Sequence, residues 1–253
     1  MASDSYSVTL LREGSEEVLP DGNIKRRCNT VLVSGPSGHM IVNPGSAWDG
    51  PDLIESLKKH GIDSPSKIKY VVCTDGRAAH VGCLNLFVDA EMMIVGHDIQ
   101  KGQDVFVEHS FSDATVPFEI DEHLSVVGTP GTMDQQVTVL VKGLITPHAS
   151  MSDPAPSEPS CVAITGSIFA DAADASKTGF FDAHSMKPDF MGDKESYLSV
   201  WRRSRDRLLA IADWIFPAFG RPFKVGSHFH VFNLLVPFFA DIDLLTDTFA
   251  YVN

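Results

Sequence analysis

The sequence contains few cysteines and no long apolar run. Its four cysteines, at positions 28, 73, 83 and 161, form no C-x-x-C pair, which excludes a zinc-finger spacing and a dithiol redox motif. No segment approaches the roughly 20 consecutive apolar residues of a membrane-spanning helix. The first residues also lack the basic and apolar segments of a secretory signal. We therefore expect a cytoplasmic protein without a membrane span.

Basic residues are also scarce. The chain has 20 Lys and Arg against 33 Asp and Glu, so its formal net charge at pH 7 is −13. A protein this acidic repels nucleic-acid backbones and anionic lipid, so we expect no nucleic-acid partner. The 43% share of hydrophobic residues is typical of globular proteins, and 253 residues suffice for one large domain.

Short apolar segments separated by turn residues predict one layered α/β domain. Strands are expected at residues 5–12, 28–34, 39–43, 67–73, 91–96, 117–120, 124–127, 137–141 and 161–165, and helices at 51–60, 81–87 and 197–215. In the last helix, Leu198, Trp201 and Leu208 form the predicted buried face. Arg205 belongs to the opposite face, which we expect in solvent.

Five segments resemble, in order, the motifs of the metallo-β-lactamase superfamily, particularly its small cytosolic members. They are Ile41-Val-Asn-Pro-Gly45, Thr74-Asp-Gly-Arg-Ala-Ala-His-Val-Gly82, Val127-Gly-Thr-Pro-Gly-Thr132, Ile164-Thr-Gly-Ser-Ile-Phe169 and Ala212-Asp-Trp-Ile-Phe-Pro-Ala-Phe-Gly-Arg-Pro-Phe223. In that family the second segment reads T-H-x-H-x-D-H-x-G, a tight loop whose side chains bind two zinc ions.

The resemblance implies both the fold and the domain organisation. The expected fold is an α/β protein of the metallo-β-lactamase type, an αββα sandwich of two mixed β-sheets flanked by helices. The domain is expected to span residues 1–253, with residues 224–253 as a C-terminal apolar extension. Family members hydrolyse esters, thioesters, lactams or phosphodiesters with a zinc-bound hydroxide.

The ligand positions, however, carry other residues. Matched to the family motifs, they are Asp75, Arg77, Ala79, His80, Thr132, Ser167 and Phe219, and only His80 keeps the residue of the family. Arg77 would bring a permanent positive charge into a site for two dications. Ala79 and Phe219 have no donor atom. We therefore expect no zinc and no other cofactor, and we assign no catalytic residue.

The replaced positions allow more than one interpretation. Arg77 could form an ion pair with Asp75 that fills the vacated metal space, or it could hold the carboxylate or phosphate of a ligand. His80 is interpreted as a hydrogen-bonded core or loop histidine, with weak metal binding by Asp75 and His80 left open.

The C-terminal segment 231–239 (VFNLLVPFF) is apolar but too short to span a bilayer. It could cover the edge of the domain, form a homodimer contact or line an apolar pocket. The preceding His228-Phe-His230 pattern is interpreted as solvent-side strand residues rather than as a relocated metal site.

These observations lead to three functional hypotheses. The first is a catalytically inactive pseudoenzyme whose former active-site cleft binds a small, largely apolar molecule. The second is a non-catalytic structural or regulatory interaction protein. The third is a metal-poor hydrolase of the esterase or thioesterase type.

Overall fold

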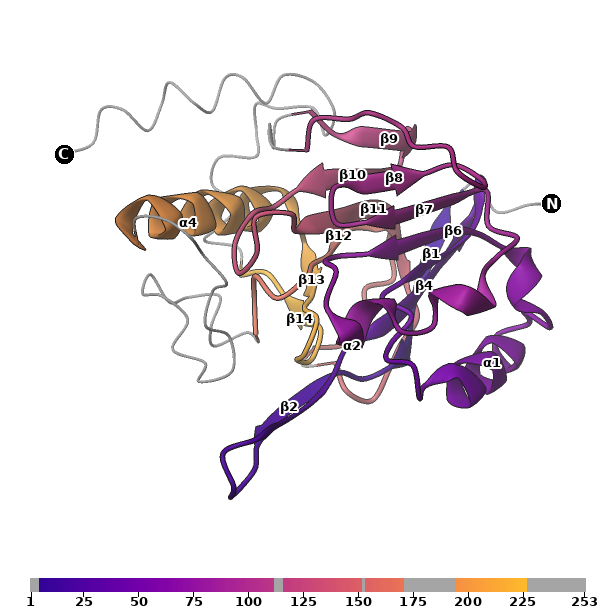
Figure 1. Cartoon of the computed structure of the whole chain (residues 1–253), viewed down its shortest axis with the longest axis horizontal. Coiled ribbons are helices and arrows are strands. Elements are labelled where there is room, and N and C mark those ends of the chain that lie inside the picture. The colour runs from indigo at the N-terminus through magenta and orange to yellow at the C-terminus, as the bar shows by residue number, and fades with distance from the viewer. Residues whose placement is uncertain (1–4, 112–115, 152, 171–193, 227–253) are drawn as a thin grey trace.

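The computed structural model describes residues 5–111, 116–151, 153–170 and 194–226 (Figure 1). The strands are β1 (Tyr6–Arg12), β2 (Ser15–Val18), β3 (Ile24–Arg27), β4 (Thr30–Gly35), β5 (Gly38–Val42), β6 (Ile68–Cys73), β7 (Met92–Val95), β8 (Asp98–Gln100), β9 (Phe118–Asp121), β10 (Leu124–Gly128), β11 (Val137–Ile145), β12 (Ser160–Ile164), β13 (Trp214–Phe216) and β14 (Phe223–Lys224). The helices are α1 (Gly50–Lys59), α2 (Ala78–Val81) and α4 (Lys194–Ile211), with 3₁₀ turns η1 (Pro65–Lys67) and η2 (Leu84–Leu86).

The main sheet is mixed and is folded into two halves. Its strands follow the order β14-β13-β12-β11-β1-β4-β5-β6-β7-β8, with β10 and β9 branching from β11. Residues 137–141 of β11 pair with β10 and residues 139–143 pair with β12, whereas residues 143–145 pair in parallel with β1. The long strand β11 therefore connects the two halves. The β2–β3 hairpin projects from the body of the domain (Figure 1).

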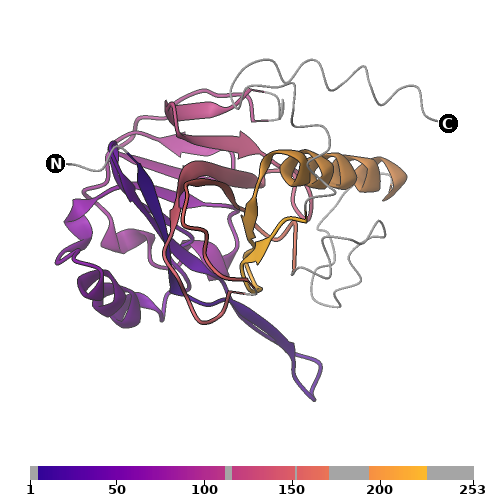
Figure 2. The same cartoon turned by 180° about the vertical axis from the view of Figure 1, so that it is seen from behind.

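Three apolar clusters separate four layers. The central cluster joins the inner faces of the two halves, including Val8 and Val33 from one and Val126 and Val139 from the other. The other two clusters pack α1 and η2 on the first half, and α4 on the second. Figures 1 and 2 show α1 and α4 on opposite sides of the strands. The predicted arrangement of helix, sheet, sheet and helix is confirmed.

Two predicted helices differ from the structure. The expected helix at 81–87 is divided into α2 and η2, because Gly82 packs directly on the backbone of residues 46 and 47. The expected helix at 197–215 ends at Ile211, and Ile215 instead lies in β13, paired with Ala163 and Phe223. The apolar residues at 212–215 suit a buried strand as well as a helix face, so periodicity alone could not separate the two.

The predicted exposure of Arg205 is wrong. Its side chain is 2% exposed, and Nη1 donates a hydrogen bond of 2.7 Å to the carbonyl oxygen of Ile168. The guanidinium also lies 4.4 Å from the ring centroid of Phe169 and 4.5 Å from that of Trp201. Arg205 is therefore a buried contact between α4 and the loop after β12.

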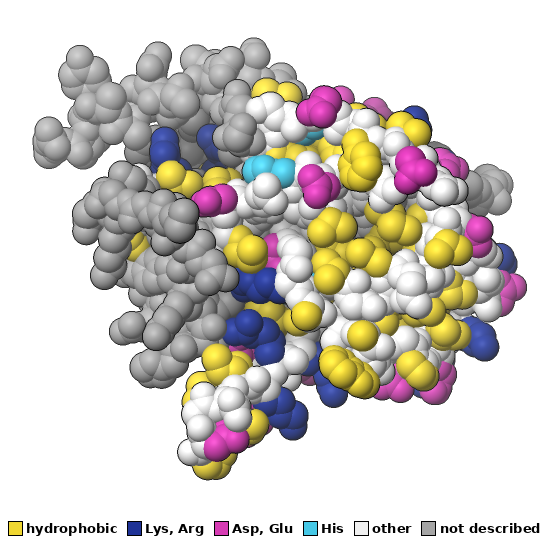
Figure 3. All heavy atoms as spheres, in the orientation of Figure 1, with side chains coloured by type: hydrophobic (Ala, Val, Ile, Leu, Met, Phe, Trp, Pro, Cys, Tyr) yellow, Lys and Arg dark blue, Asp and Glu magenta, His cyan; other side chains and the backbone are white. Residues whose placement is uncertain are grey.

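Large apolar side chains are also exposed. Trp48, Val88 and Phe106 are 88%, 76% and 63% exposed. Figure 3 shows apolar side chains over the face that carries β6, β7 and β8. Most of the expected C-terminal extension, including His228, His230 and residues 231–239, lies outside the described residues, so its predicted contacts stay predictions. No described helix has the length and hydropathy needed to cross a membrane.

Candidate functional site

The five motif segments are joined by hydrogen bonds at one end of the sheet. The side-chain oxygen of Asn43, after β5, accepts a bond of 2.9 Å from the backbone N–H of Thr74, after β6. The carbonyl oxygen of Thr74 accepts one of 2.9 Å from the N–H of Val137. The N–H of Ala218 donates to the carbonyl oxygen of Gly166 at 3.1 Å, which joins the last two segments. Side chains from distant parts of the sequence can therefore meet here.

Arg77 connects three of these segments through its side chain. Its Nη1 donates to Ser167 Oγ at 2.9 Å and its Nη2 donates to Thr132 Oγ1 at 3.0 Å. Nε lies 3.0 Å from the sulfur of Met133. The guanidinium thus bonds to two residues that stand at ligand positions of the family motifs. Its side chain is 22% exposed, so one part of it faces solvent.

Asp75 interacts with Arg77 mainly through the backbone. Asp75 Oδ1 accepts a hydrogen bond of 3.0 Å from the N–H of Arg77, which closes a turn of the kind that aspartate side chains favour. The closest side-chain approach is 3.9 Å, between Arg77 Nε and Asp75 Oδ2. The predicted Asp75–Arg77 ion pair is therefore present at long range, and the two hydroxyls are the closer partners of the guanidinium.

His80 is fully buried, and one of its two ring nitrogens has hydrogen-bond partners among the described residues. Its Nδ1 lies 3.0 Å from Asn43 Oδ1 and 3.0 Å from Thr74 Oγ1. Its Nε2 lies 3.8 Å from Asp75 Oδ1 and has no hydrogen-bond partner among the described residues. Burial lowers the pKa of His80, an effect that Asp75 opposes and that Arg77 and Arg26 reinforce. The imidazole is therefore held in its neutral form at neutral pH.

The residues at this site do not fit a zinc ion. His80 Nε2 and Asp75 Oδ2 are buried donor atoms without a partner among the described residues, so they could contribute two ligands. Bound zinc normally takes at least three from the protein. Within the described ranges, no group of three or more His, Cys, Asp or Glu side chains is placed to hold a metal. The guanidinium of Arg77 adds a permanent positive charge beside the same two atoms.

Phe219 lies between a histidine and an arginine. Its ring meets that of His80 edge to face, with centroids 5.4 Å apart and planes at 86°. The guanidinium carbon of Arg26 lies 4.8 Å from the centroid of the Phe219 ring. Arg26 belongs to β3 of the projecting hairpin and pairs with Glu16 across it, at 2.6 Å. The ring, which is half-buried, is thus the apolar part of this site.

Ala79 takes part in the site through its backbone. Its backbone carbonyl accepts a hydrogen bond of 2.8 Å from the thiol of Cys28. Asp75, Thr132 and Ser167 therefore lie around the guanidinium of Arg77. His80 lies beside Asp75 and Phe219. Ala79 contributes only backbone.

Sequence reasoning missed two residues of the site, Arg26 and Gln136. Gln136 is fully buried. In the orientation that satisfies both ends of its carboxamide, the oxygen accepts from the N–H groups of Ser167 and Ile168, at 2.5 and 3.3 Å. Nothing in the motif pattern identifies Gln136. Arg26 lies in the basic run 25–27, a signal that could have been examined as a possible cover for the motif loops.

Among the described residues, neither hydroxyl at the ligand positions has a neighbouring base. The closest side-chain partner of both Ser167 Oγ and Thr132 Oγ1 is a guanidinium, which cannot accept their protons. The histidine of the site contacts Thr74 and Asn43 through Nδ1 instead. The described side chains of the site comprise the hydrogen-bonded guanidinium of Arg77, the ring of Phe219 and the guanidinium of Arg26.

Comparison with curated proteins identifies similar chains. No family model matches the sequence. The chain is 29% identical over 225 residues to metallo-β-lactamase domain-containing protein 1 of Xenopus laevis, an alignment that covers 88% of this chain and 83% of that protein. It is 27% identical over 258 residues to the protein of the same name from Rattus norvegicus, covering 88% and 89%.

Solved structures show the same architecture. A putative metallo-β-lactamase from Thermotoga maritima aligns with a TM-score of 0.55 and 16% identity, covering 87% of this chain and 99% of that one. A B3 metallo-β-lactamase with an active-site glutamic acid aligns with a TM-score of 0.53 and 13% identity, covering 80% and 78%. At these identities the likeness concerns the fold alone.

Proposed function

We propose that this protein, which has the metallo-β-lactamase fold, is a non-catalytic member of that structural class and does not use zinc. The observation that carries the proposal is the pair of hydrogen bonds from Arg77 to Ser167 and Thr132. In this interpretation the guanidinium takes over the structural task of the metals, because it supplies positive charge and connects the same loops. Zinc would then have to displace a bonded arginine and would find too few ligands.

We also propose that the former metal cleft is a binding site for a small molecule with an apolar body. The half-buried Phe219 ring would contact that body, and Arg77 and Arg26 would face an acidic or carbonyl end. Ligand sites commonly combine an apolar wall with a few polar groups that set orientation. The 22% exposure of the Arg77 side chain supports this role, because a fully enclosed guanidinium could not be reached.

A structural or regulatory protein is the second candidate. It is favoured by the same bonds of Arg77, since a guanidinium that already holds two hydroxyls and a sulfur has fewer donors left for a ligand. In this alternative, surfaces outside the cleft would carry the function. A serine-type hydrolase has no comparable support, because Ser167 lacks a neighbouring base in the described contacts.

Native mass spectrometry of gently purified full-length protein, with elemental zinc analysis and an absorbance spectrum, tests these proposals together. We expect well under one zinc per chain and a bound small molecule. Two equivalents of zinc would contradict the non-catalytic proposal. A zinc-free chain without a ligand would leave the structural alternative.

The binding site is tested by a pair of variants. Phe219→Asp should abolish retention of a co-purified molecule, and Arg77→Ala should weaken it. Retention that is unchanged in Phe219→Asp would place the ligand outside the former metal cleft. Lys101→Gln, an exposed change on another loop, is the control.

A further inference from the structure

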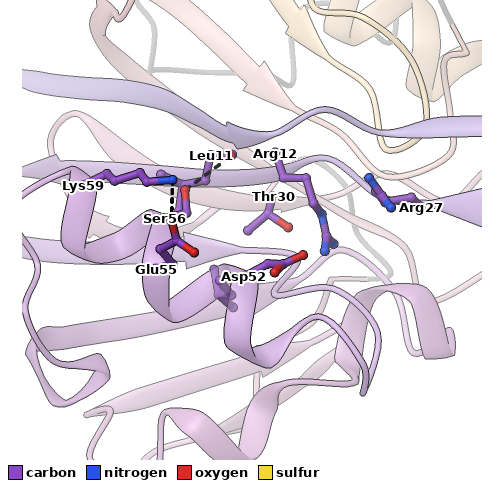
Figure 4. A pocket seen from close by; sticks show the side chains of 9 residues that line it. Leu11, Arg12, Arg27, Thr30, Asp52, Glu55, Ser56 and Lys59 are labelled. Atoms are coloured by element: carbon purple, nitrogen blue, oxygen red, sulfur yellow. Dashed lines mark hydrogen bonds and ion pairs between the residues drawn. The ribbon is translucent and has the colours of Figure 1, made fainter.

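A second polar hollow lies beside helix α1, outside the former metal site (Figure 4). It has a volume of about 320 Å³ and lies between residues 52–59 of α1 and the ends of β1, β3 and β4. Leu11 and Leu53 form its apolar part, and most of the other lining side chains carry charge. The hollow is large enough for a small organic molecule and too polar for an apolar one.

Three basic and two acidic side chains line this hollow, and two ion pairs are already made. Arg12 Nη1 lies 2.6 Å from an oxygen of Asp49, and Lys59 Nζ lies 2.7 Å from one of Glu55. Arg27 and Asp52 also line the hollow, and neither has an ion-pair partner among the described residues. Figure 4 shows Arg12, Arg27 and Asp52 toward one end, with Lys59 and Glu55 toward the other. One cation and one anion are therefore available to a ligand.

Arg12 and Thr30 also bring buried polar atoms to the wall of the hollow. Arg12 Nε and Thr30 Oγ1 are enclosed and have no oxygen or nitrogen partner among the described residues, and Thr30 is only 2% exposed. These atoms add to the polarity of the end of the hollow where Arg27 lies.

We propose that this hollow binds a small zwitterion of the size of a free amino acid or a dipeptide. The ligand carboxylate would bind Arg27, and its ammonium would bind Asp52. A phosphate or another dianion fits less well, because Asp52 and Glu55 line the same space. A cation without an acidic group would face three basic side chains. Only a ligand with both charges complements both available groups.

Isothermal titration calorimetry of the full-length protein tests the proposal with four probes. Leucine and the dipeptide glycyl-leucine carry both charges, N-acetyl-glycyl-leucine lacks the ammonium, and glycyl-leucinamide lacks the carboxylate. We expect a zwitterion to bind and each blocked dipeptide to bind at least about tenfold more weakly, since each loses a charge-assisted hydrogen bond. This comparison uses the unmodified chain and does not depend on variants folding.

Two variants then test which side chain binds the carboxylate and which binds the ammonium of the ligand. In Arg27→Gln, the preference for glycyl-leucine over its amide should vanish while the preference over the acetylated form remains. Asp52→Asn should show the reverse. Lys25→Gln removes a charge from the same strand outside the hollow and should leave both preferences unchanged. The proposal is overturned if neither zwitterion binds at millimolar concentration, if the blocked forms bind equally well, or if the acetylated form binds best.

Discussion

Arg77 combines two properties that a single zinc-ligand side chain lacks: it carries its own positive charge and it donates several hydrogen bonds. At its position after β6 it reaches Ser167 after β12 and Thr132 after β10. A planar guanidinium can bond two hydroxyls at once in a fixed geometry, which a lysine ammonium on a flexible stem cannot match. The replacements at positions 77, 132 and 167 therefore form one connected group.

The first prediction concerns this connection. Arg77→Ala should lower the free energy of unfolding by about 2–3 kcal/mol, because it removes the hydrogen bonds of the guanidinium to two buried hydroxyls. For a chain of this size that is a fall in melting temperature of about 4–10 °C. Differential scanning fluorimetry and urea unfolding measure it. Arg77→Lys should recover less than half of the loss, and the exposed Arg203→Ala should have little effect. An unchanged melting temperature in Arg77→Ala would show that these bonds do not stabilise the fold.

The second prediction concerns the pH dependence of stability at His80. Because burial lowers its folded pKa below the ordinary 6.5, the unfolded chain binds the proton more readily as pH falls below about 6.5. The neutral histidine therefore contributes stability above that pH, and the contribution is lost on acidification toward the folded pKa. His39 and His97 also have lowered pKa values and act in the same direction.

Urea unfolding at several pH values between about 7.5 and 5 measures this effect. His80→Gln should lose less stability over that range than the unmodified protein. The exposed His60→Gln should behave like the unmodified protein. A pH profile that is the same for all three chains would contradict the prediction.

At the scale of secondary-structure elements, α2 is fixed by a close backbone contact. The N–H of Gly82 donates to the carbonyl oxygen of Gly45 at 2.7 Å, just after α2 ends. A Cβ atom at Gly82 would lie 2.1 Å from the backbone nitrogen of Ala47, far inside van der Waals contact. The segment that carries Arg77 and His80 is thereby held against the loop after β5.

The third prediction follows from this contact. Gly82→Ala should destabilise the protein by about 3 kcal/mol, because backbone must move to accept the methyl group. Gly76→Ala, in the same motif, should be nearly neutral since no heavy atom lies within 4 Å of its added Cβ. Chemical denaturation compares the two. Equal stability of both variants would contradict the prediction, because it would mean that the loop after β5 can move to accommodate the added methyl group.

At the scale of the whole molecule, apolar packing and strand pairing join the two halves of the sheet. The central cluster takes apolar side chains from both halves, and β11 pairs with strands of each. The motif loops are held further by Asn43, Thr74, Arg77 and Gln136. This network of packing and hydrogen bonds, including those of the Arg77 guanidinium, offers a physical basis for stability without a bound ion.

The fourth prediction is that a chelator leaves stability unchanged. In a protein whose structure depends on metal, removing the ion removes binding free energy that contributes to folding. We expect the same melting temperature with and without EDTA, measured on the full-length protein by scanning calorimetry. A fall of several degrees in EDTA would reveal a structural metal and contradict the proposal for Arg77.

The sequence by itself located nine of the strands and the layered α/β fold, because apolar periodicity and motif order are local properties of the chain. It did not predict the short strands β2, β3, β8, β13 and β14 or the order of the strands in the sheet. It could not decide how Arg77 is used, since Ser167 and Thr132 approach it only when distant strands pair. Arg205 and Ile215 were misplaced for the same reason: their local pattern suited a helix, whereas long-range contacts decided their burial and pairing. Gln136 and the hollow beside α1 emerge only where separate elements pack together, so only the tertiary structure could reveal them.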